Sequence, residues 1–194
     1  GADAVGLVFF GGSVRCVDIE PAREIAFALP PFVSKVGLFV NASDAEVRAV
    51  LAAVPLDLLQ FHGDETAAFC EQFQRPYMKA VRVGAQVDLL QCVHSYRSAC
   101  ALLLDAQIEG SFGGTGRTFD WRLIPRNLGL PIVLSGGLNP DNVTDAVRQV
   151  QPWAVDVSSG VEASKGRKDP TKVMRFIQGV RNADAKSAAD AAGV

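Results

Sequence analysis

The sequence alternates short apolar runs with segments that have the periodicity of amphipathic helices, and it does so seven times without a linker or a change of composition. The apolar runs do not alternate with polar residues, which is typical of parallel strands covered on both faces. Strands are expected at residues 4–9, 35–40, 56–61, 77–83, 101–104, 132–134 and 153–157. Helices are expected at residues 19–29, 44–53, 65–74, 87–96, 121–126 and 170–181, with one more starting after Pro140. This order predicts an α/β fold with a parallel sheet in a single domain.

Polar or glycine residues follow nearly every expected strand, and their distribution distinguishes two arrangements of the sheet. They include Arg15, His62, Asp105, Gly136-Gly137 and Ser159-Gly160. A doubly wound sheet gathers such residues at one switch point, whereas a (β/α)8 TIM barrel brings the loop after every strand to one mouth. We therefore expect a TIM barrel. Because only seven βα units can be counted, residues 1–182 are expected to form an incomplete barrel, with the remaining unit before Gly1 and a disordered tail at 183–194.

The composition excludes several classes of protein. The chain is 48% hydrophobic and 21% charged with a net charge of -2, and it has no basic stripe, so no nucleic-acid partner is expected. Its apolar runs are too short to span a bilayer, so no membrane partner is expected either. Four cysteines without Cys-x-x-Cys spacing indicate reduced thiols in a cytoplasmic protein, rather than disulfides or a metal site.

Asp105 is the candidate for acid chemistry, since it ends a short apolar run and precedes a glycine-rich loop. Ligands of parallel α/β folds bind beyond the carboxyl ends of the strands, which would put this carboxylate at the reacting centre. The alternative is that Asp105 only caps the strand end or a turn.

Two glycine-containing loops near the end of the chain are candidates for binding phosphate. Gly136 and Gly137 follow the sixth expected strand, and Ser159 and Gly160 follow the seventh. Exposed backbone amides at such loops bind phosphate without a cationic side chain, and in barrels they commonly follow the last two strands. The alternative is that these glycines only permit tight turns.

These residues lie in segments that resemble phosphoribosylanthranilate isomerase, the tryptophan-pathway enzyme that converts N-(5-phosphoribosyl)anthranilate to its ribulose isomer by an Amadori rearrangement. The resemblance runs in order from Gly1 to about Val180. Its segments are GADAVG (1–6), PPFV (30–33), VGLFVN (36–41), QFHGDE (60–65), GGTGRTFDW (113–121), SGGLNP (135–140) and VDVSSGVE (155–162).

The resemblance implies a role for each candidate. Asp105 would be the general acid that protonates the furanose ring oxygen, and Arg15 would hold the anthranilate carboxylate. His62 would position the substrate, and Asp156 would line the pocket. Without the resemblance, Arg15 would be read as a solvated loop cation, His62 as a structural histidine, and Asp156 equally well as a partner of nearby backbone or arginine groups. No metal or organic cofactor is expected, and the oligomer would be a monomer or a homodimer.

The resemblance also implies that the loop at 113–118 closes over the acid, with Arg117 anchoring it rather than touching substrate. Lys79 and Arg82 lie on one expected strand, but the sequence does not say which of them points inward.

One departure from the family concerns the proton acceptor. The family's first strand ends in a Lys-Ile-Cys-Gly type motif whose cysteine is the general base, and this motif does not occur here. We expect that cysteine upstream of Gly1, so that the chain as printed would be nearly inactive. Alternatives are another phosphosugar barrel, such as a histidine-pathway isomerase or indole-glycerol-phosphate synthase, and an inactive truncated barrel that binds a phosphorylated ligand.

Overall fold

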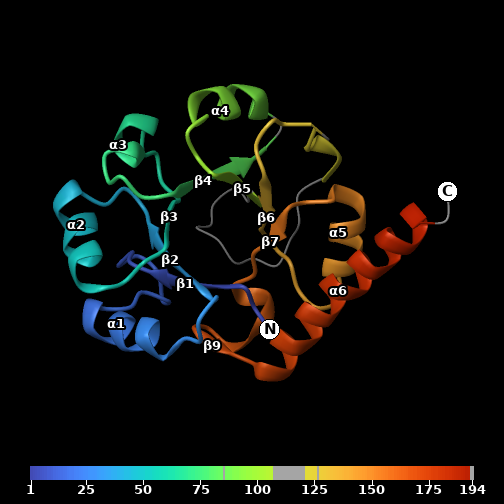
Figure 1. Cartoon of the computed structure of the whole chain (residues 1–194), viewed down its shortest axis with the longest axis horizontal. Helices are drawn as coiled ribbons and strands as arrows, with labels where there is room; N and C mark the ends of the chain where they lie inside the picture. The colour runs from blue at the N-terminus through green and yellow to red at the C-terminus, as the bar shows by residue number, and fades with distance from the viewer. Residues whose placement is uncertain (85, 107–120, 126, 193–194) are drawn as a thin grey trace. The chain divides into compact units, whose positions relative to one another are not determined.

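The computed structural model describes residues 1–84, 86–106, 121–125 and 127–192, without the side chains of 106 and 186–192. Seven strands follow one another in the sheet in chain order (Figure 1). They are β1 (Ala4–Val8), β2 (Ser34–Phe39), β3 (Leu58–Phe61), β4 (Tyr77–Val83), β5 (Ala101–Ala106), β6 (Ile132–Leu134) and β7 (Ala154–Val155). Strand β2 pairs in parallel with β1 and β3, β3 with β4, and β6 with β7. The predicted α/β order with parallel strands is confirmed.

The helices follow the expected pattern, with differences in length. They are α1 (Ile19–Ala28), α2 (Asp44–Ala53), α3 (Ala67–Glu71), α4 (Leu89–Ser95), α5 (Val143–Val150) and α6 (Pro170–Ala192), with 3-10 turns η1 (Trp121–Leu123) and η2 (Ser159–Val161). The helix expected at 121–126 is only the turn η1, because Pro125 disfavours the helical conformation of the residue before it. Helix α6 continues past Arg181, where the sequence pattern placed its end, and includes tail residues up to Ala192.

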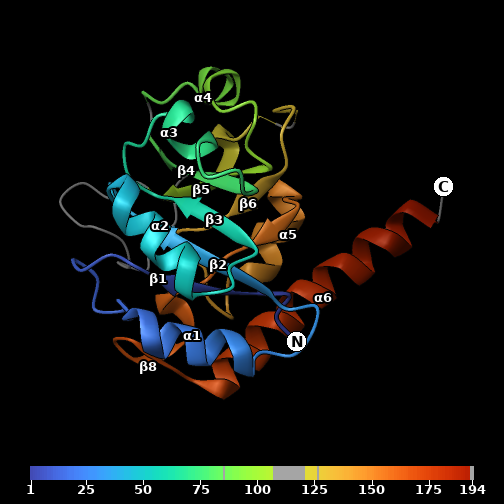
Figure 2. The ribbon, with the colours of Figure 1, turned by 60° about the vertical axis from the view of Figure 1, so that its left-hand side comes forward.

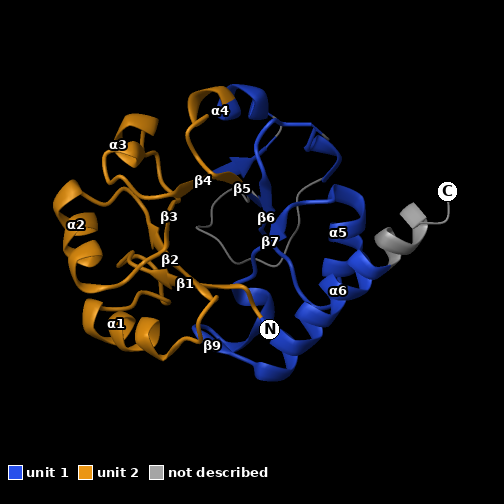
Figure 3. Ribbon diagram, viewed as in Figure 1, with its two compact units in different colours: residues 1, 81–93, 103–194 blue, residues 2–80, 94–102 orange. Residues whose placement is uncertain are grey.

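The chain divides into two compact units, which Figure 3 colours separately. Unit 2 comprises Ala2–Ala80 and His94–Leu102, and unit 1 comprises Gly1, Val81–Val93 and Leu103–Val194. Each unit is described by itself below.

In unit 2, α1, α2 and α3 lie along the strands β1 to β3 (Figure 1). Their shared core includes Phe39, Leu59 and Phe61, each at most 1% exposed. Helix α2 begins with a capping box, in which Ser43 accepts from the Glu46 amide and the Glu46 side chain accepts from Ser43. Such a cap satisfies amides that have no partner within the helix. Unit 2 is thus an apolar core from which polar loops emerge at the strand ends.

In unit 1, α5 and α6 pack side by side (Figures 1 and 2), and their core includes Leu134, Val143 and Phe176. A short antiparallel hairpin, β8 (Glu162–Ser164) and β9 (Arg167–Lys168), lies between η2 and α6. The sequence did not predict this hairpin, because its strands are two or three residues long and largely exposed, which leaves no apolar pattern. None of the helices in the described ranges is both long and apolar enough to cross a membrane.

Candidate active site

Three polar side chains stand at the carboxyl ends of neighbouring strands in unit 1. Asp105 lies near the end of β5, Ser135 follows β6, and Asp156 follows β7. The Ser135 amide donates to the carbonyl oxygen of Leu104 over 2.8 Å, and the Asp156 amide donates to that of Leu134 over 2.8 Å. These backbone bonds align the three strand ends, so the residues that follow the strands are brought to one edge of the sheet.

The surroundings of Asp105 are apolar on the strand side. Leu102, Leu103 and Leu104 are 0% exposed, and the Asp105 residue itself is half-buried. Strand β5 therefore runs from a fully buried apolar segment to a partly exposed end at Asp105.

The loop after β6 requires glycine for its backbone. Gly136 and Gly137 have φ of 82° and 70°, a left-handed region that residues with a Cβ rarely adopt. The Asn142 side-chain amide donates to the Gly137 carbonyl oxygen over 3.0 Å, and its Oδ1 accepts from the Asn139 amide over 2.9 Å. Asn142 thus ties down the glycine turn directly before α5 begins.

The loop after β7 packs against the loop after β6. A Cβ built on Gly160 would overlap the carbonyl oxygen of Leu138, so only glycine allows this approach. The Lys168 ammonium donates to the Ser158 carbonyl oxygen over 2.7 Å and lies 3.3 Å from Oε1 of Glu162, whose side chain is 4% exposed. The predicted phosphate residues Gly136, Gly137, Ser159 and Gly160 therefore lie on two loops in direct contact.

The other two predicted residues, Arg15 and His62, belong to unit 2. The loop of Arg15 is folded by a bond from its amide to Oγ of Ser13 and by the backbone bridge between Val8 and Cys16. His62 follows β3, and its amide donates to the Phe39 carbonyl oxygen over 2.8 Å. Both residues are half-buried, His62 directly after β3 and Arg15 in the loop after β1.

The His62 ring contacts a buried side chain of strand β3. Nδ1 of His62 lies 3.1 Å from Nε2 of Gln60, a residue 5% exposed. The imidazole is therefore held through the nitrogen that lies toward β3.

Sequence reasoning missed Glu65 as a functional candidate and left Lys79 undecided. The structure buries Lys79 and exposes Arg82, and the Lys79 ammonium lies 3.3 Å from Oε2 of Glu65, with both side chains at most 5% exposed. The available signals were a lysine inside a strand with five consecutive buried positions and a glutamate after the His-Gly-Asp turn.

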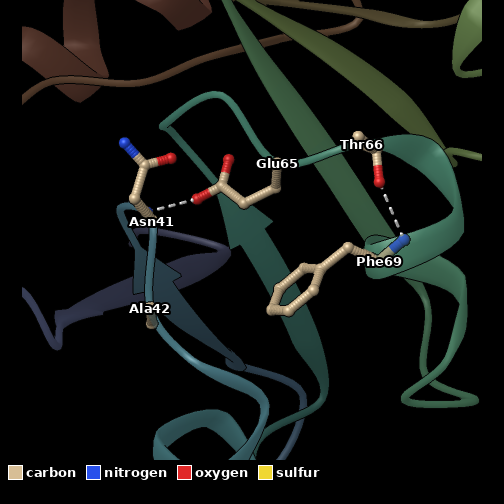
Figure 4. Close-up of a pocket in the computed structure, with 5 residues that line it drawn as sticks. All are labelled: Asn41, Ala42, Glu65, Thr66 and Phe69. Carbon is tan, nitrogen blue, oxygen red and sulfur yellow. Dashed lines mark hydrogen bonds between the residues drawn. The ribbon is translucent and has the colours of Figure 1, made fainter.

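A pocket of about 230 Å³ is lined by Asn41, Ala42, Glu65, Thr66 and Phe69, and so includes one partner of this ion pair (Figure 4). Oε1 of Glu65 accepts from the Asn41 amide over 2.7 Å, and Oγ1 of Thr66 accepts from the Phe69 amide. The polar groups that line this pocket are thus engaged in holding the loops together.

A larger pocket of about 390 Å³ lies in unit 1, near the amino ends of β6 and β7, where Pro131 and Trp153 belong to its lining. It is at the opposite ends of these strands from Ser135 and Asp156. The larger hollow is therefore not the place where the candidate side chains gather.

Two further expectations concern the chemistry of the site. Arg117 and the loop at 113–118 lie outside the described residues. Within the described ranges, no group of three or more histidine, cysteine, aspartate or glutamate side chains could hold a metal ion.

Comparison with known proteins gives one consistent result. A family model described as "N-(5'phosphoribosyl)anthranilate (PRA) isomerase" matches residues 1–179. The N-(5'-phosphoribosyl)anthranilate isomerase of Pseudomonas aeruginosa strain LESB58 is 59% identical over 182 residues, which are 94% of this chain and 86% of that protein.

Solved structures agree. The phosphoribosyl anthranilate isomerase of Thermotoga maritima has a TM-score of 0.86 at 42% identity, covering 94% of this chain and 89% of that one. A structure of the isomerase in complex with reduced 1-(o-carboxyphenylamino)-1-deoxyribulose 5-phosphate has a TM-score of 0.82 at 41% identity, with the same coverage. The chain therefore belongs to the phosphoribosylanthranilate isomerase family, the isomerases of tryptophan biosynthesis.

Proposed function

We propose that Asp105 is the general acid of the Amadori rearrangement of N-(5-phosphoribosyl)anthranilate to 1-(2-carboxyphenylamino)-1-deoxyribulose 5-phosphate. The observation that carries this proposal is the alignment of the ends of β5, β6 and β7. Asp105 belongs to the same unit as the two glycine-containing loops that follow β6 and β7. An acid and a phosphate grip on adjacent strand ends are what a ring-opening reaction on a phosphosugar requires.

The first step transfers the Asp105 proton to the furanose ring oxygen. The bond between C1 and this oxygen breaks, the anilino nitrogen supplies the electron pair, and a protonated Schiff base forms. Loss of a proton from C2 then gives the enol-amine, which becomes the aminoketone product by tautomerisation. The carboxyl group must be protonated to donate in this step, and the strand that carries it, Leu102 to Leu104, is fully buried.

The proton acceptor for C2 is not assigned to any residue of this chain. The family resemblance implies a cysteine as this acceptor. The same resemblance supports a single barrel domain over residues 1–182.

The phosphate is proposed to bind to the backbone amides of Gly136, Gly137, Ser159 and Gly160. Support comes from the contact between the two loops and from the positive φ of the glycines, a backbone conformation that occurs in anion-binding loops. Asp156 is proposed to line the site beside Ser135, because its carboxylate accepts a hydrogen bond from the Ser135 hydroxyl group.

The anthranilate end is assigned to Arg15 and His62. A guanidinium suits the bidentate binding of a carboxylate, and an imidazole can form a hydrogen bond to substrate. Both residues are half-buried in the segments that follow strands β1 and β3, which leaves part of each residue accessible.

The enzyme is proposed to work in the cytoplasm as a monomer or homodimer, with the phosphosugar as its partner molecule and without a cofactor. Four cysteines without a disulfide support the compartment. A step that needs only proton transfer supports the absence of a cofactor.

The test measures turnover by the full-length protein through the loss of the fluorescence of the anthranilate group. Asp105→Asn keeps the shape of the side chain but cannot supply a proton, so turnover should fall about a hundredfold or more. Inhibition by inorganic phosphate should be unchanged in this variant. Asp184→Asn, on the exposed face of α6 in the same unit, is the matched control and should retain activity. Full activity of Asp105→Asn would refute the assignment of the acid.

A further inference from the structure

The buried cation in unit 2, the Lys79 ammonium, has more hydrogen-bond acceptors around it than it has protons. It donates to the carbonyl oxygens of Gly63, Ala80 and Phe61 over 2.6, 3.2 and 3.3 Å, and it lies 3.3 Å from Oε2 of Glu65. An ammonium has three protons for these four acceptors, so at least one proton is shared. A lysine that is 4% exposed needs such partners, because burying an unpaired charge is costly.

Two of these acceptors flank His62 in the sequence. Phe61 precedes it and Gly63 follows it, so one cation holds the peptide carbonyl on either side of the histidine. The backbone at His62 cannot rotate without losing one of the two bonds. The Lys79 side chain thereby fixes the direction in which the His62 side chain leaves the end of β3.

Glu65 completes the arrangement on the other side of the turn. Its Oε2 accepts from the Gly63 amide over 2.9 Å, and its Oε1 accepts from the Asn41 amide at the end of β2 over 2.7 Å. A Cβ on Gly63 would overlap the Asn41 side chain, so this turn and the end of β2 are in close contact. Figure 4 shows the Glu65 carboxylate reaching Asn41. The ion pair therefore links β4, the turn after β3, and the end of β2.

We propose that Lys79 and Glu65 are positioning residues for the substrate, which they reach only through His62. This inference rests on the proposed role of His62 in binding substrate. Neither Lys79 nor Glu65 touches substrate, since both side chains are buried and their polar atoms are engaged with the turn. Their function is to hold the imidazole where one hydrogen bond to the substrate forms without further ordering.

The alternative is that the ion pair only stabilises the fold. The two roles differ in kinetics, because a variant that is partly unfolded has fewer active molecules and an unchanged KM. A variant with a misplaced His62 has a raised KM in every molecule. The measurement that separates them is therefore KM against kcat, combined with a double-mutant cycle.

The test compares three variants with the wild-type enzyme. His62→Ala removes the proposed contact, and Lys79→Met with Glu65→Gln removes both charges together, which avoids leaving one buried charge unpaired. The third variant combines all three substitutions. Both His62→Ala and the neutral pair should raise KM about tenfold with kcat within about twofold. The combined variant should be no worse than His62→Ala alone.

The proposal would be overturned if KM of the combined variant rose by about a hundredfold, which is the product of the two separate increases. It would also be overturned if the neutral pair lowered kcat and left KM unchanged. If the neutral pair does not fold, Lys79→Arg alone serves, because it keeps a buried cation beside Glu65 but replaces the ammonium that donates to the carbonyl oxygens on both sides of His62 with a planar guanidinium. This single variant should raise KM in the same way, and an unchanged KM would reject the inference. If His62→Ala itself leaves KM unchanged, the proposed function of His62 fails, which is a separate outcome.

Discussion

The hydroxyl group of Ser135 donates a hydrogen bond to Oδ2 of Asp156 over 3.1 Å. This bond links the first residue after β6 to the first residue after β7, next to the backbone bond between the Asp156 amide and Leu134. Ser135 is 8% exposed, whereas Asp156 is exposed, so the bond joins a buried hydroxyl group to a carboxylate at the surface. The two loops proposed to bind phosphate start from this linked pair.

Substitution Ser135→Ala tests that link. The variant loses one hydrogen bond to a charged group, which typically lowers the free energy of unfolding by about 1.5–3 kcal/mol. Because the exposed Asp156 carboxylate can be solvated by water instead, we expect a loss near the lower value of this range. Thermal unfolding should show a fall of about 3–6 °C in Tm. Phosphate inhibition should weaken only a few-fold. A loss of phosphate binding beyond tenfold would mean that the hydroxyl group itself contacts the ligand.

Gly160→Ala tests the contact between the two loops. The added Cβ would overlap the Leu138 carbonyl oxygen, which is backbone and cannot move aside cheaply. Moving a proposed binding group by about 1 Å can cost a hundredfold, so KM for the phosphosugar should rise at least tenfold. The control is Gly6→Ala, where a Cβ would meet no atom within 4 Å. Equal KM values for the two variants would contradict the proposed packing of the phosphate loops.

The sequence predicted the features of unit 1 that depend on local chemistry. Glycine at the end of a strand is visible in the sequence because the left-handed backbone of Gly136 and Gly137 selects for it. Asp105 was visible for a similar reason, since a carboxylate stands out after a run of buried leucines.

The partners of Lys79 could not be predicted from the sequence. Strand β4 has five consecutive buried positions, so no alternation reveals which way each side chain points. Its ion-pair partner Glu65 lies 14 residues away on another loop, and only the tertiary packing of β3 against β4 brings the two together. The hairpin after η2 was not predicted for a different reason. Lys168 and its neighbours are charged and exposed, so the sequence shows no apolar pattern typical of a strand.

The thiol of Cys70 should make stability depend on alkaline pH. Burial raises the pKa of Cys70 to about 12, an effect that Glu65 and Glu71 increase and the Lys79 ammonium opposes. In the unfolded chain a cysteine has a pKa near about 8.5. Below that value the thiol is protonated in both states and costs nothing. Above it, the unfolded state loses its proton while the folded state keeps it, so stability falls as pH rises towards the folded pKa.

The measurement compares wild type with Cys70→Ala in denaturant melts between pH 8 and 10.5. The substitution removes the titrating group, although it also leaves a small cavity whose cost does not vary with pH. The stability of the wild type should fall relative to the variant by up to about 1.4 kcal/mol for each pH unit above the unfolded pKa. Parallel curves for the two proteins would show that Cys70 is not the group responsible.

Lys168→Met tests whether a cation orients the loop after β7. The Lys168 ammonium donates to the Ser158 carbonyl oxygen over 2.7 Å, which holds that oxygen against the hairpin. Without this ammonium, the Ser158 carbonyl group loses a hydrogen bond that fixes its direction. The buried Glu162 carboxylate still accepts from the Gly166 amide over 3.3 Å but loses its contact with the Lys168 cation. The expected result is a rise of about three- to tenfold in KM for the phosphosugar, with weaker inhibition by inorganic phosphate and a small change in kcat.

Lys165→Met is the matched control, because Lys165 is an exposed lysine on the same hairpin and its substitution changes the net charge equally. If long-range attraction of the phosphate were the only contribution of Lys168, both variants would raise KM alike, and KM of both would return to the wild-type value at high salt. A higher KM of Lys168→Met than of Lys165→Met that persists at high ionic strength assigns the effect to the bond with Ser158.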